Sequence, residues 1–543
     1  MVDPAWRAHV PATARIEADD LTLEGTLVRA WVARWRAGPD HPVLHDPVRG
    51  WLTGAQLEQW SRHVAQELGG REVGRGCRVL LSGATNIELV VVHVALMRLG
   101  AVVVPVNGAY REREVTHIVR DCRPVMAVVA DPQWAPWIAS VDPHCVVVSV
   151  GDAAVAGAAA DSDAGAALDA PAGLDAGAAL DAFGPDAPAM IGYTSGTTGV
   201  PKGAVLSHRN LLASVAALAI AWRWTGDDRL VLCLPLFHMH GLGVGLHGTL
   251  YVGASAVLLD GFDPDEVIDA IGEHDATLFF GVPTMYHRLV DNARVGELKR
   301  LRLCVAGSAA LSPSVHEAFH AATGRAVLER YGMTETVMLV SNPYDGERRA
   351  GAVGIPLPGV EARFTREDGA SVDLAAAGLD GETGEILVRG PNVFRGYWER
   401  PATNVAAFVD GWFRTGDLAT VARDGYITIV GRAKELIITG GFNVYPREVE
   451  EVVALHPAIA EVAVVGTPSN EWGEEVTAFV VVRPGHPAPD RDAVRDFCRE
   501  QLARFKLPRR VVTVDALPRN ALGKVVKHEL RCPPEPGRAS DRP

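Results

Sequence analysis

The chain has 543 residues, 48% of them hydrophobic and 22% charged, a composition typical of globular proteins at a length that predicts at least two domains. Its net charge of −14, without a long run of Lys or Arg, argues against a nucleic-acid-binding protein. The most apolar stretch, Leu89–Val106, is interrupted by His93, Arg98 and Gly100 and predicts a buried helix and strand rather than a membrane span.

The seven cysteines are dispersed, and none forms a CxxC pair. This pattern is typical of reduced thiols in a protein core. Because the N-terminal stretch "MVDPAWRAHV" also lacks the apolar region of a signal peptide, we expect a cytoplasmic protein. Its oligomeric state, monomer or homodimer, does not follow from the sequence.

The first clear elements in chain order are a strand at Val79–Leu81, a helix at Asn86–Leu99 and a strand at Ala101–Val106. This βαβ unit predicts a parallel sheet with helices on its faces. Similar apolar runs follow at Pro124–Ala130, His144–Val150, Arg229–Leu236, Ala276–Pro283 and Leu301–Gly307.

Residues 151–186 are rich in Ala, Gly and Asp, and "DAGAALDA" occurs at both Asp163–Ala170 and Asp175–Ala182. Such low-complexity sequence has little apolar mass to bury, so it predicts a mobile surface connection.

The residue pattern in the last third of the sequence predicts two further structural units. From about Gly359, short β segments alternate with Gly- and Asp-rich turns, and after Arg432 helices and strands form a small α+β unit. We therefore expect an α/β fold. A large N-terminal domain (1–433) combines parallel-sheet αβα subdomains with a small β-barrel-like subdomain. A small mobile α+β domain (434–531) and a disordered tail (532–543) follow.

The stretch "YTSGTTGVPKG", Tyr193–Gly203, follows an apolar run and predicts a loop at the end of a strand. Backbone N–H groups in such a Gly-, Ser- and Thr-rich turn can bind an anion. The loop does not match the Walker pattern, because Pro201 precedes Lys202 and Gly203 follows it. By itself it is compatible with either a phosphate site or a turn without a ligand.

Two histidines, His238 and His240, stand in "LPLFHMHGL". Their spacing allows a metal site, but no carboxylate lies close in sequence. A role in lining a pocket or in the core is the preferred interpretation.

Two later stretches carry polar groups suited to a nucleotide. "ERYGMTETVML", Glu329–Leu339, has an aromatic ring to stack on a base, hydroxyls for a phosphate and Glu335 for Mg²⁺. "WFRTGDLA" presents Asp417 to a ribose diol. Each is equally compatible with an ordinary polar turn. Lys524 in "LPRNALGKVVK", considered by itself, is predicted to be a solvent-exposed lysine.

Together, and in this order, these motifs resemble the adenylate-forming superfamily of acyl-CoA synthetases, peptide-synthetase adenylation domains and luciferases. The resemblance extends from about Leu27 to Leu530 and includes "YGMTET", "TGD", "GRAKELI" and the terminal "GK". It implies a two-step reaction that uses ATP, Mg²⁺ and CoA. A carboxylic acid attacks the α-phosphate of ATP to form acyl-AMP and pyrophosphate, and CoA then displaces AMP.

The resemblance also implies site residues. Lys524, Thr334 and Glu335 are the expected catalytic residues, with Glu335 as the Mg²⁺ ligand and Thr194 as a second candidate ligand. The expected ATP and AMP contacts are Thr194, Ser195, Gly196, Thr197, Thr198, Gly199, Lys202, Gly307, Ser308, Ala309, Glu329, Arg330, Tyr331, Gly332, Met333, Thr334, Asp417, Arg432 and Lys524.

The C-terminal domain of this family rotates between the two steps, and here Lys434 is the expected hinge. Gly440, Gly441 and Phe442 in "GGFNVYPREVE" are expected to line the path of the CoA thiol. A lysine at the hinge position is more like stand-alone CoA ligases than peptide-synthetase domains.

The expected acyl pocket contains His238, Gly281, Met285 and Arg288. Arg288 is a candidate clamp for a second carboxylate, and "GVPTMYHR" resembles malonyl-CoA synthetases. The sequence therefore predicts a ligase for a small acid such as malonate or methylmalonate. "GGFNVYPREVE", however, resembles fatty- or aryl-acid ligases.

Three alternatives stay open. The first is a medium-chain or aromatic acid–CoA ligase, and the second is an adenylating enzyme whose acceptor is an amine, another small nucleophile or a carrier protein. The third, a binding module without activity, is disfavoured because both Glu335 and Lys524 are present.

Overall fold

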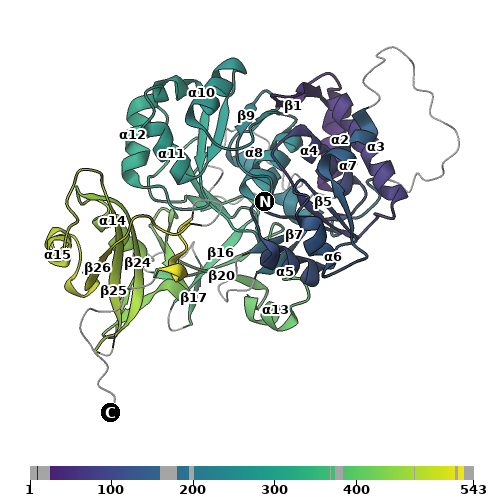
Figure 1. The fold of residues 1–543 in the computed structure, drawn as a ribbon. Coiled ribbons are helices and arrows are strands. Elements are labelled where there is room, and N and C mark those ends of the chain that lie inside the picture. The colour runs from purple at the N-terminus through teal and green to yellow at the C-terminus, as the bar shows by residue number, and fades with distance from the viewer. Residues whose placement is uncertain are drawn as a thin grey trace, which may run out of the picture.

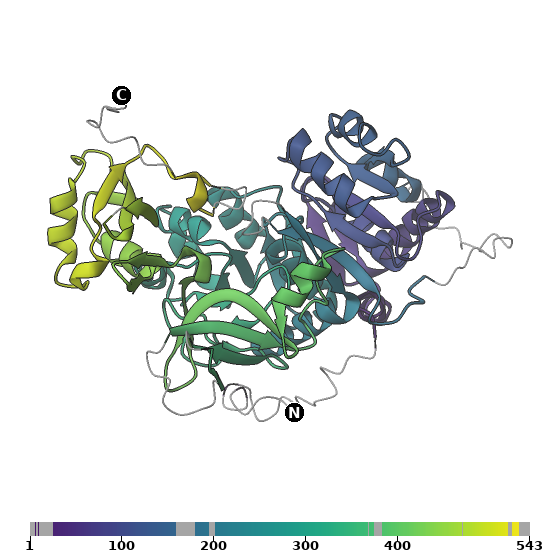
Figure 2. The same ribbon diagram turned by 90° about the horizontal axis from the view of Figure 1, so that it is seen from below.

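The computed structural model describes Trp6, His9 and residues 25–158, 180–194, 201–366, 369–373, 383–469, 471–519 and 524–530. Four sheets organise these residues. Three belong to the large N-terminal part, and the fourth forms the centre of a smaller C-terminal part that lies to one side in Figures 1 and 2.

The first sheet has six strands in the order β6-β5-β3-β4-β7-β8. All neighbours are parallel except β7 and β8, which form an antiparallel hairpin. Its strands are β3 (Arg78–Ser82), β4 (Val102–Pro105), β5 (Met126–Val129), β6 (Val146–Ser149), β7 (Pro188–Thr194) and β8 (Lys202–Ser207). The predicted βαβ unit is confirmed as β3, a helix and β4.

The second sheet has nine strands in the order β15-β14-β13-β12-β11-β9-β10-β1-β2. The strands from β13 to β1 are parallel, and the pairs at both ends are antiparallel. Its strands are β1 (Pro42–Asp46), β2 (Gly50–Thr53), β9 (Arg229–Leu232), β10 (Ser255–Leu258), β11 (Leu278–Gly281), β12 (Leu303–Ala306), β13 (Leu328–Tyr331), β14 (Val340–Ser341) and β15 (Ile355–Pro356).

Helices pack on both faces of these two sheets, which gives five layers. Leu80 of β3 packs with the outer helices α5 and α6, whereas its neighbours Val79 and Leu81 join a core shared with β9 and β10 of the other sheet. The second sheet buries Val231 against α10, α11 and α12 on its far side. Alternate residues of one strand thus serve two cores, as the period of a strand requires.

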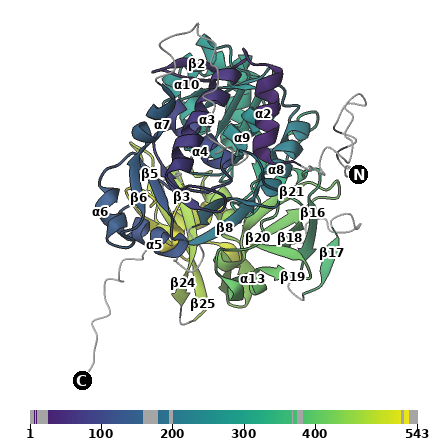
Figure 3. The same ribbon diagram turned by 90° about the vertical axis from the view of Figure 1, so that its right-hand side faces the viewer.

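The layers contain the following helices. Between the sheets and at their margins lie α2 (Leu27–Ala37), α3 (Gly54–Gly70), α4 (Ile87–Arg98), α7 (Val150–Ala158), α8 (His208–Ala221), the π-helix η3 (His240–Leu246) and α9 (His247–Val252). The outer helices are α5 (Glu112–Cys122), α6 (Trp134–Ala139), α10 (Pro264–Glu273), α11 (Pro283–Val290), η4 (Val295–Arg300) and α12 (Pro313–Thr323). Figure 1 shows α10–α12 and α5–α6 on opposite sides of the N-terminal part, and in Figure 3 α10 lies near the top and α5 and α6 at the lower left.

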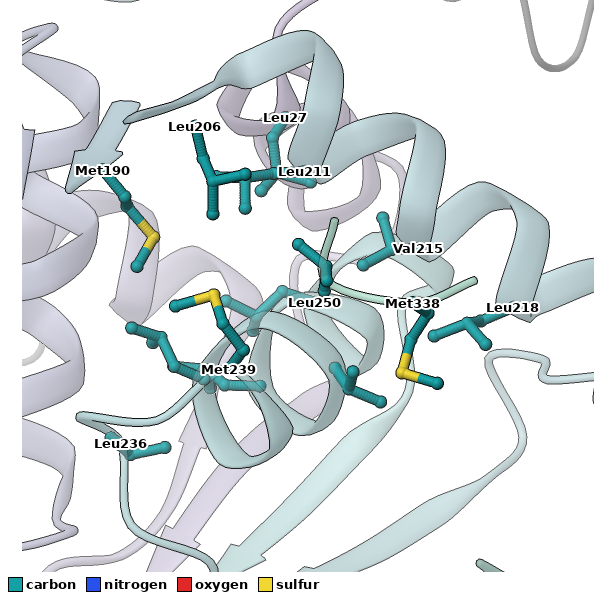
Figure 4. Close-up of a cluster of buried hydrophobic side chains, with 14 of the residues drawn as sticks. Leu27, Met190, Leu206, Leu211, Val215, Leu218, Leu236, Met239, Leu250 and Met338 are labelled. Atoms are coloured by element: carbon teal, nitrogen blue, oxygen red, sulfur yellow. The ribbon is translucent and has the colours of Figure 1, made fainter. Parts of the chain in front are cut away.

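The central core determines the position of the loop that carries His238 and His240. Figure 4 shows Leu236 and Met239 from this loop among side chains of β7, β8, α8 and α9. Met239 is 4% exposed and Leu236 is 6% exposed. Because the residues that flank His238 are anchored in the core, the histidines themselves are held in place.

The predicted surface connection at 151–186 is wrong for the parts of it that the structure describes. Residues up to Ala158 form α7, which buries Ala153 and Ala154, and Trp60 Nε1 donates to the Ala154 carbonyl at 2.9 Å. The small alanines permit this close approach between α7 and α3. Further on, Phe183 is buried against His208, with ring centroids 4.6 Å apart. The rest of the connection, 159–179, lies outside the described residues.

The third sheet is antiparallel and corresponds to the predicted barrel-like subdomain. Its order is β17-β16-β18-β20-β19, and β21 pairs with β20. The elements are β16 (Glu361–Thr365), β17 (Ser371–Asp373), β18 (Thr383–Arg389), α13 (Pro401–Ala407), β19 (Phe408–Val409), β20 (Trp412–Val421) and β21 (Ile427–Arg432). After β18 the chain pairs with β8, where Trp398 N donates to the Gly203 carbonyl at 2.8 Å.

The C-terminal part is a small α+β unit, as predicted. Its sheet has the order β23-β22-β25-β24, with β26 beside β25. It contains η5 (Ala433–Glu435), β22 (Ile437–Thr439), β23 (Phe442–Val444), α14 (Pro446–Val453), β24 (Ile459–Ser469), β25 (Gly473–Val482), α15 (Arg491–Cys498), η6 (Arg504–Lys506), β26 (Arg510–Thr513) and η7 (Lys527–Glu529). The third sheet ends and the fourth begins on either side of the predicted domain boundary, and the predicted tail, 532–543, lies outside the described residues.

All six cysteines in the described part of the chain are free thiols. Burial raises the pKa of Cys122, Cys145, Cys233 and Cys304 to about 12, so these thiols are unreactive core groups. Within the described ranges, no helix has both the length and the apolar character needed to cross a membrane.

Candidate active site

The candidate site lies where strands of the second sheet end. Gly307 and Ser308 follow β12, Tyr331 ends β13, and the His238 loop follows β9. Ligands of open α/β sheets bind at the carboxyl ends of their strands. The β7–β8 hairpin, the third sheet and the C-terminal loop with Lys524 complete the surroundings.

Asp417 joins Tyr331 and Arg432 in one buried cluster. Asp417 and Arg432 are direct partners in the β20–β21 register, and Asp417 Oδ1 lies 2.7 Å from Arg432 Nε. The Tyr331 hydroxyl donates to Asp417 Oδ2. Burial raises the pKa of Asp417, and Arg432 opposes that shift. The structure thus brings together the residues expected at the adenine and the ribose.

Glu335 and Lys202 meet at Tyr397, a residue that the sequence analysis did not identify. The Tyr397 hydroxyl donates to Glu335 Oε1 at 2.8 Å, and Lys202 Nζ lies 5.6 Å from the centre of the Tyr397 ring. Burial raises the pKa of Glu335, which is 5% exposed. Tyr397 stands in "NVFRGYWER", where an aromatic among polar residues was the available signal; its partner Glu335 is 62 positions away in sequence.

Thr334 packs against the hairpin that carries the predicted phosphate loop. A side chain at Gly192 of β7 would place its Cβ 2.4 Å from Thr334 Cγ2, so the close approach requires glycine. Gly332 is equally constrained, because a Cβ there would lie 2.2 Å from the Val337 carbonyl. The segment Gly332–Glu335 therefore turns tightly against β7.

The predicted phosphate loop is the tip of the β7–β8 hairpin. Thr194 pairs with Lys202, and Thr194 Oγ1 donates to the Lys202 carbonyl at 3.5 Å. Ser195, Gly196, Thr197, Thr198 and Gly199 lie outside the described residues. A loop between two strands differs from a Walker loop, which connects a strand to a helix.

Lys524 reaches this site from the C-terminal part. The bridge between Arg519 and Val525 anchors its loop, and Lys527 Nζ lies 2.7 Å from Glu450 Oε1 and 3.6 Å from Glu435 Oε2. Burial of its ammonium group lowers the pKa of Lys524, and the charge of Arg432 lowers it further.

Lys524 affects the pKa values of groups in both the expected ribose site and the expected acyl pocket. Burial raises the pKa of Asp417 and lowers that of His238 to about 4, and Lys524 contributes a lowering to each. The lysine therefore stands within electrostatic range of the expected ribose site and of the expected acyl pocket.

The expected hinge residue follows Arg432 of the cluster by two positions, whereas the expected CoA residues contact other residues of the C-terminal part. Lys434 is in η5. Gly440 and Gly441 have φ of 56° and 82° in the β22–β23 turn, and a Cβ on Gly440 would lie 2.8 Å from Trp472. Phe442 stacks on Phe505 at 4.6 Å. The contacts of this turn are thus within the C-terminal part.

The acyl side contains two histidines with lowered pKa values. Burial, and then the charge of Arg330, lower the pKa of His238 and His240, so both imidazoles are neutral at neutral pH. The His240 backbone N–H donates to His238 Nδ1 at 3.2 Å, and His240 Nδ1 lies 3.4 Å from Ser308 Oγ.

The predicted clamp Arg288 has contacts elsewhere. Its side chain is 55% exposed, its guanidinium lies 4.9 Å from the centre of the Phe262 ring, and Nη2 is 3.9 Å from Asp263. Met285 is half-buried on the same helix, and Gly281 leaves space between the rings of Phe279 and Tyr286.

Glu329 and Arg330 point to opposite faces of β13. Glu329 accepts hydrogen bonds from Gly351 N at 2.7 Å and Leu311 N at 3.4 Å, so it holds two loops together. Burial raises the pKa of Glu329 to about 7. Arg330 lies against Gly307. Because Glu329 and Arg330 face these other neighbours, neither of the two joins the Tyr331–Asp417 cluster. Met333 Sδ is 4.0 Å from the Tyr331 hydroxyl, and Ala309 is exposed.

Comparison with known proteins matches both parts of the chain. The family described as AMP-binding enzyme matches residues 31–398, and the AMP-binding enzyme C-terminal domain matches residues 448–524. The indoleacetate–CoA ligase of Aromatoleum aromaticum is 35% identical over 507 residues, which cover 92% of this chain and 97% of the relative.

Two further relatives are similar to this chain. The mitochondrial malonate–CoA ligase ACSF3 of Mus musculus is 42% identical over 376 residues, which cover 64% of this chain and 64% of the relative, so the match spans less than two thirds of that protein. The crystal structure of ATP-bound MatB from Rhodopseudomonas palustris is 39% identical, with a TM-score of 0.83 and coverage of 92% of this chain and 97% of that one. The two chains therefore share one fold over most of their lengths.

Proposed function

Because the chain belongs to the AMP-binding enzyme family, we propose that it is an acid–thiol ligase. It activates a carboxylic acid with ATP as an acyl adenylate, releases pyrophosphate and passes the acyl group to CoA. The observation that supports this proposal most directly is the approach of Lys524 to the Asp417–Arg432 pair, because a cation from a second domain is thereby aimed at the expected nucleotide site.

In the first half-reaction, a carboxylate oxygen of the acid forms a bond to the α-phosphorus of ATP. The bond from that phosphorus to the bridging oxygen breaks, and pyrophosphate leaves with the electron pair. Negative charge develops on the α-phosphate oxygens, and the Lys524 ammonium is placed to stabilise it. Thr334 donates its hydroxyl to the same phosphate, and Lys202 holds the leaving pyrophosphate.

The residues around Glu335 fit a magnesium ion. Mg²⁺ prefers hard oxygen ligands and is usually held by one or two carboxylates together with substrate phosphates. Glu335 supplies such a carboxylate, Tyr397 orients it, and Thr194, opposite Lys202 in the hairpin, would offer a hydroxyl. The ion would neutralise phosphate charge, which the buried carboxylate alone would oppose.

In the second half-reaction, the CoA thiolate attacks the acyl carbon, and AMP leaves. Lys434 is the proposed pivot about which the C-terminal domain turns, so that Lys524 withdraws and the Gly440–Phe442 turn approaches. The two adjacent glycines permit a close approach of the pantetheine arm. The cytoplasmic location remains part of this proposal.

The favoured acid is malonate or methylmalonate. This choice is supported by the similarity to the mouse malonate–CoA ligase and by the polar lining that His238 and His240 supply. The similarity to the indoleacetate–CoA ligase keeps an aromatic or medium-chain acid as the second candidate. An acceptor other than CoA is the third.

A pyrophosphate-exchange screen over mono- and dicarboxylic acids tests the first step. We expect exchange with malonate and methylmalonate to exceed exchange with propionate, octanoate and phenylacetate. AMP release with and without CoA then tests the acceptor. Absence of exchange with every acid would refute the proposed activity, and AMP release that only an amine stimulates would refute CoA as the acceptor.

A further inference from the structure

Asp121, near the end of α5, is a largely enclosed carboxylate whose two oxygens bind different segments of the chain. Its side chain is 7% exposed. Oδ2 accepts a hydrogen bond from the Tyr193 hydroxyl at 2.7 Å, and Oδ1 accepts one from Arg400 Nη2. The Asp121 backbone carbonyl accepts a third, from Trp398 Nε1 at 3.2 Å. An enclosed charge requires such partners, and each of these three comes from outside α5.

Tyr193 connects this carboxylate to the end of strand β7. In the β7–β8 register Tyr193 is the direct partner of Gly203, and Thr194 and Lys202 form the next pair. A Cβ on Gly203 would lie 3.3 Å from Tyr193 Cζ and 2.5 Å from Ile191 Cγ2, so the glycine leaves room for the tyrosine ring. Burial raises the pKa of Tyr193, so its hydroxyl is protonated and can donate to the carboxylate.

The same face of α5 also contacts the second strand of the hairpin. His117 is four positions before Asp121, so both side chains lie on one side of the helix. His117 Nε2 donates to the Pro201 carbonyl at 3.1 Å, and the ring stands edge-on to Tyr193, with centroids 6.5 Å apart. Because Pro201 directly precedes Lys202, α5 contacts both strands at the end of the hairpin that carries this lysine.

The other partners of Asp121 belong to a segment that also carries Tyr397. Trp398 N donates to the Gly203 carbonyl at 2.8 Å, so this segment runs beside β8. One position earlier, the Tyr397 hydroxyl donates to Glu335 Oε1 at 2.8 Å, and the Tyr397 ring centre lies 5.6 Å from Lys202 Nζ. The segment therefore contacts both the expected Mg²⁺ ligand and the lysine expected at the pyrophosphate.

We propose that Asp121 is a positioning residue for the pyrophosphate part of ATP, an inference that rests on the proposed ligase activity. It ties the hairpin that carries Lys202 to the segment whose Tyr397 hydroxyl holds Glu335. Two groups that must bind one ligand bind it more tightly when the protein holds them in place beforehand. Asp121 acts through these partners rather than on the nucleotide itself.

A second ion pair joins the same two segments at the surface and provides a matched control. Arg123, directly after α5, pairs with Glu399, and the two side chains are 57% and 52% exposed. Exposed pairs contribute little, because water and salt screen them. The pair between Asp121 and Arg400 is more enclosed, and its carboxylate also accepts from Tyr193. Loss of the surface pair should therefore leave the hairpin in place.

The test compares the binding of ATP with that of AMP, which lacks the β- and γ-phosphates. Isothermal titration calorimetry in the presence of Mg²⁺ gives both dissociation constants. We expect Asp121→Asn and Tyr193→Phe each to raise Kd for ATP by about 10-fold, because each removes a hydrogen bond or charge that holds the hairpin. Kd for AMP should stay as in the wild type. A role in folding alone would weaken both nucleotides equally.

Three further variants complete the test. Arg400→Gln removes the other partner of the carboxylate and should also raise Kd for ATP by about 10-fold. The double variant Tyr193→Phe/Arg400→Gln should be little weaker than either single variant, because either substitution opens the same link. Arg123→Gln should bind ATP as the wild type does. If Asp121→Asn does not fold, as judged by thermal unfolding, Tyr193→Phe and Arg400→Gln decide.

The outcomes separate the two proposals. An unchanged ratio of Kd for ATP to Kd for AMP in Tyr193→Phe and Arg400→Gln would overturn the role of Asp121 and leave the ligase activity standing. Multiplied losses in the double variant would overturn it in the same way. A wild type that binds ATP but shows no pyrophosphate exchange with any acid would refute the ligase activity. The calorimetric comparison would then still decide whether Asp121 positions the phosphate-binding groups.

Discussion

Asp417 and Arg432 face each other across the β20–β21 pair, and Asp417 Oδ1 lies 2.7 Å from Arg432 Nε. Tyr331, from a different sheet, donates to the other oxygen of Asp417. Strand β21 therefore ends in an ion pair whose carboxylate is buried, and Lys524 of the C-terminal part lies within electrostatic range of this pair. The relationship couples the nucleotide site to the position of a domain that is expected to move.

Replacement of Lys524 by alanine should abolish adenylate formation and spare thioester formation from preformed acyl-AMP. The reason is that Lys524 stabilises charge at the α-phosphate only in the first step. Pyrophosphate exchange measures the first step, and CoA-dependent release of AMP from acyl-AMP measures the second. Lys299→Ala, at an exposed lysine of η4, is the control and should leave both rates unchanged. Equal loss of both steps in a folded Lys524→Ala protein would contradict the separation of roles.

Tyr397→Phe should weaken the use of Mg²⁺ and ATP without loss of the fold. It removes the hydrogen bond to Glu335 Oε1 and keeps the ring near Lys202. A hydrogen bond to a charged group contributes about 1.5–3 kcal/mol, so kcat/KM for ATP should fall by roughly 10- to 100-fold. A titration of pyrophosphate exchange with Mg²⁺ measures the effect.

The control for this variant is Tyr426→Phe, which removes a hydroxyl that donates to the Glu347 carbonyl at 2.8 Å. It should leave the Mg²⁺ dependence as in the wild type. If Tyr397→Phe also shows a wild-type Mg²⁺ titration, the proposed orientation of Glu335 by Tyr397 is wrong.

Asp417→Asn should destabilise the protein and raise KM for ATP. The substitution leaves Arg432 without its carboxylate, and Arg432 is 31% exposed, so we expect a loss of about 1–3 kcal/mol in the free energy of unfolding. Urea unfolding measures it. A double-mutant cycle with Arg432→Gln isolates the pair, and additive effects of the two substitutions would show that the pair does not couple.

Glu329 should make the stability of the protein depend on pH. Burial raises the pKa of Glu329 in the folded state to about 7, from the ordinary glutamate value of 4.5. Because the pKa of this acid is higher in the folded state than in the unfolded state, protonated Glu329 contributes fully to stability below pH 4.5. This contribution is lost as the pH rises through 7. The loss is about 3 kcal/mol over this window, because one pKa unit corresponds to about 1.4 kcal/mol.

The measurement compares the wild type with Glu329→Gln, which cannot ionise. Between pH 4.5 and pH 8 the difference in the free energy of unfolding should shift in favour of the variant by about 3 kcal/mol. Parallel pH profiles would show that Glu329 does not titrate in this window.

Much of the architecture follows from local patterns. The apolar alternation around Val79–Val106 predicts β3, α4 and β4, because a strand or helix buried on several sides must be apolar throughout. The residues of the candidate site, such as Tyr331, Asp417, Arg432 and Lys524, are recognisable because each stands in a short motif. The same reasoning fails for the Ala-rich stretch before Ala158, because composition does not reveal that Ala153 and Ala154 are buried and that Trp60 donates to the Ala154 carbonyl.

The partners within the site depend on contacts between distant segments. Tyr397 reaches Glu335 because the chain after β18 pairs with β8, and Arg330 lies against Gly307 because β13 lies beside β12. Short motifs specify which chemical groups are available, since they depend on residue type and spacing. Which arginine is buried against Gly307 and which is exposed beside Asp263 is set by the packing of strands and helices far apart in the chain, and no local pattern contains that information.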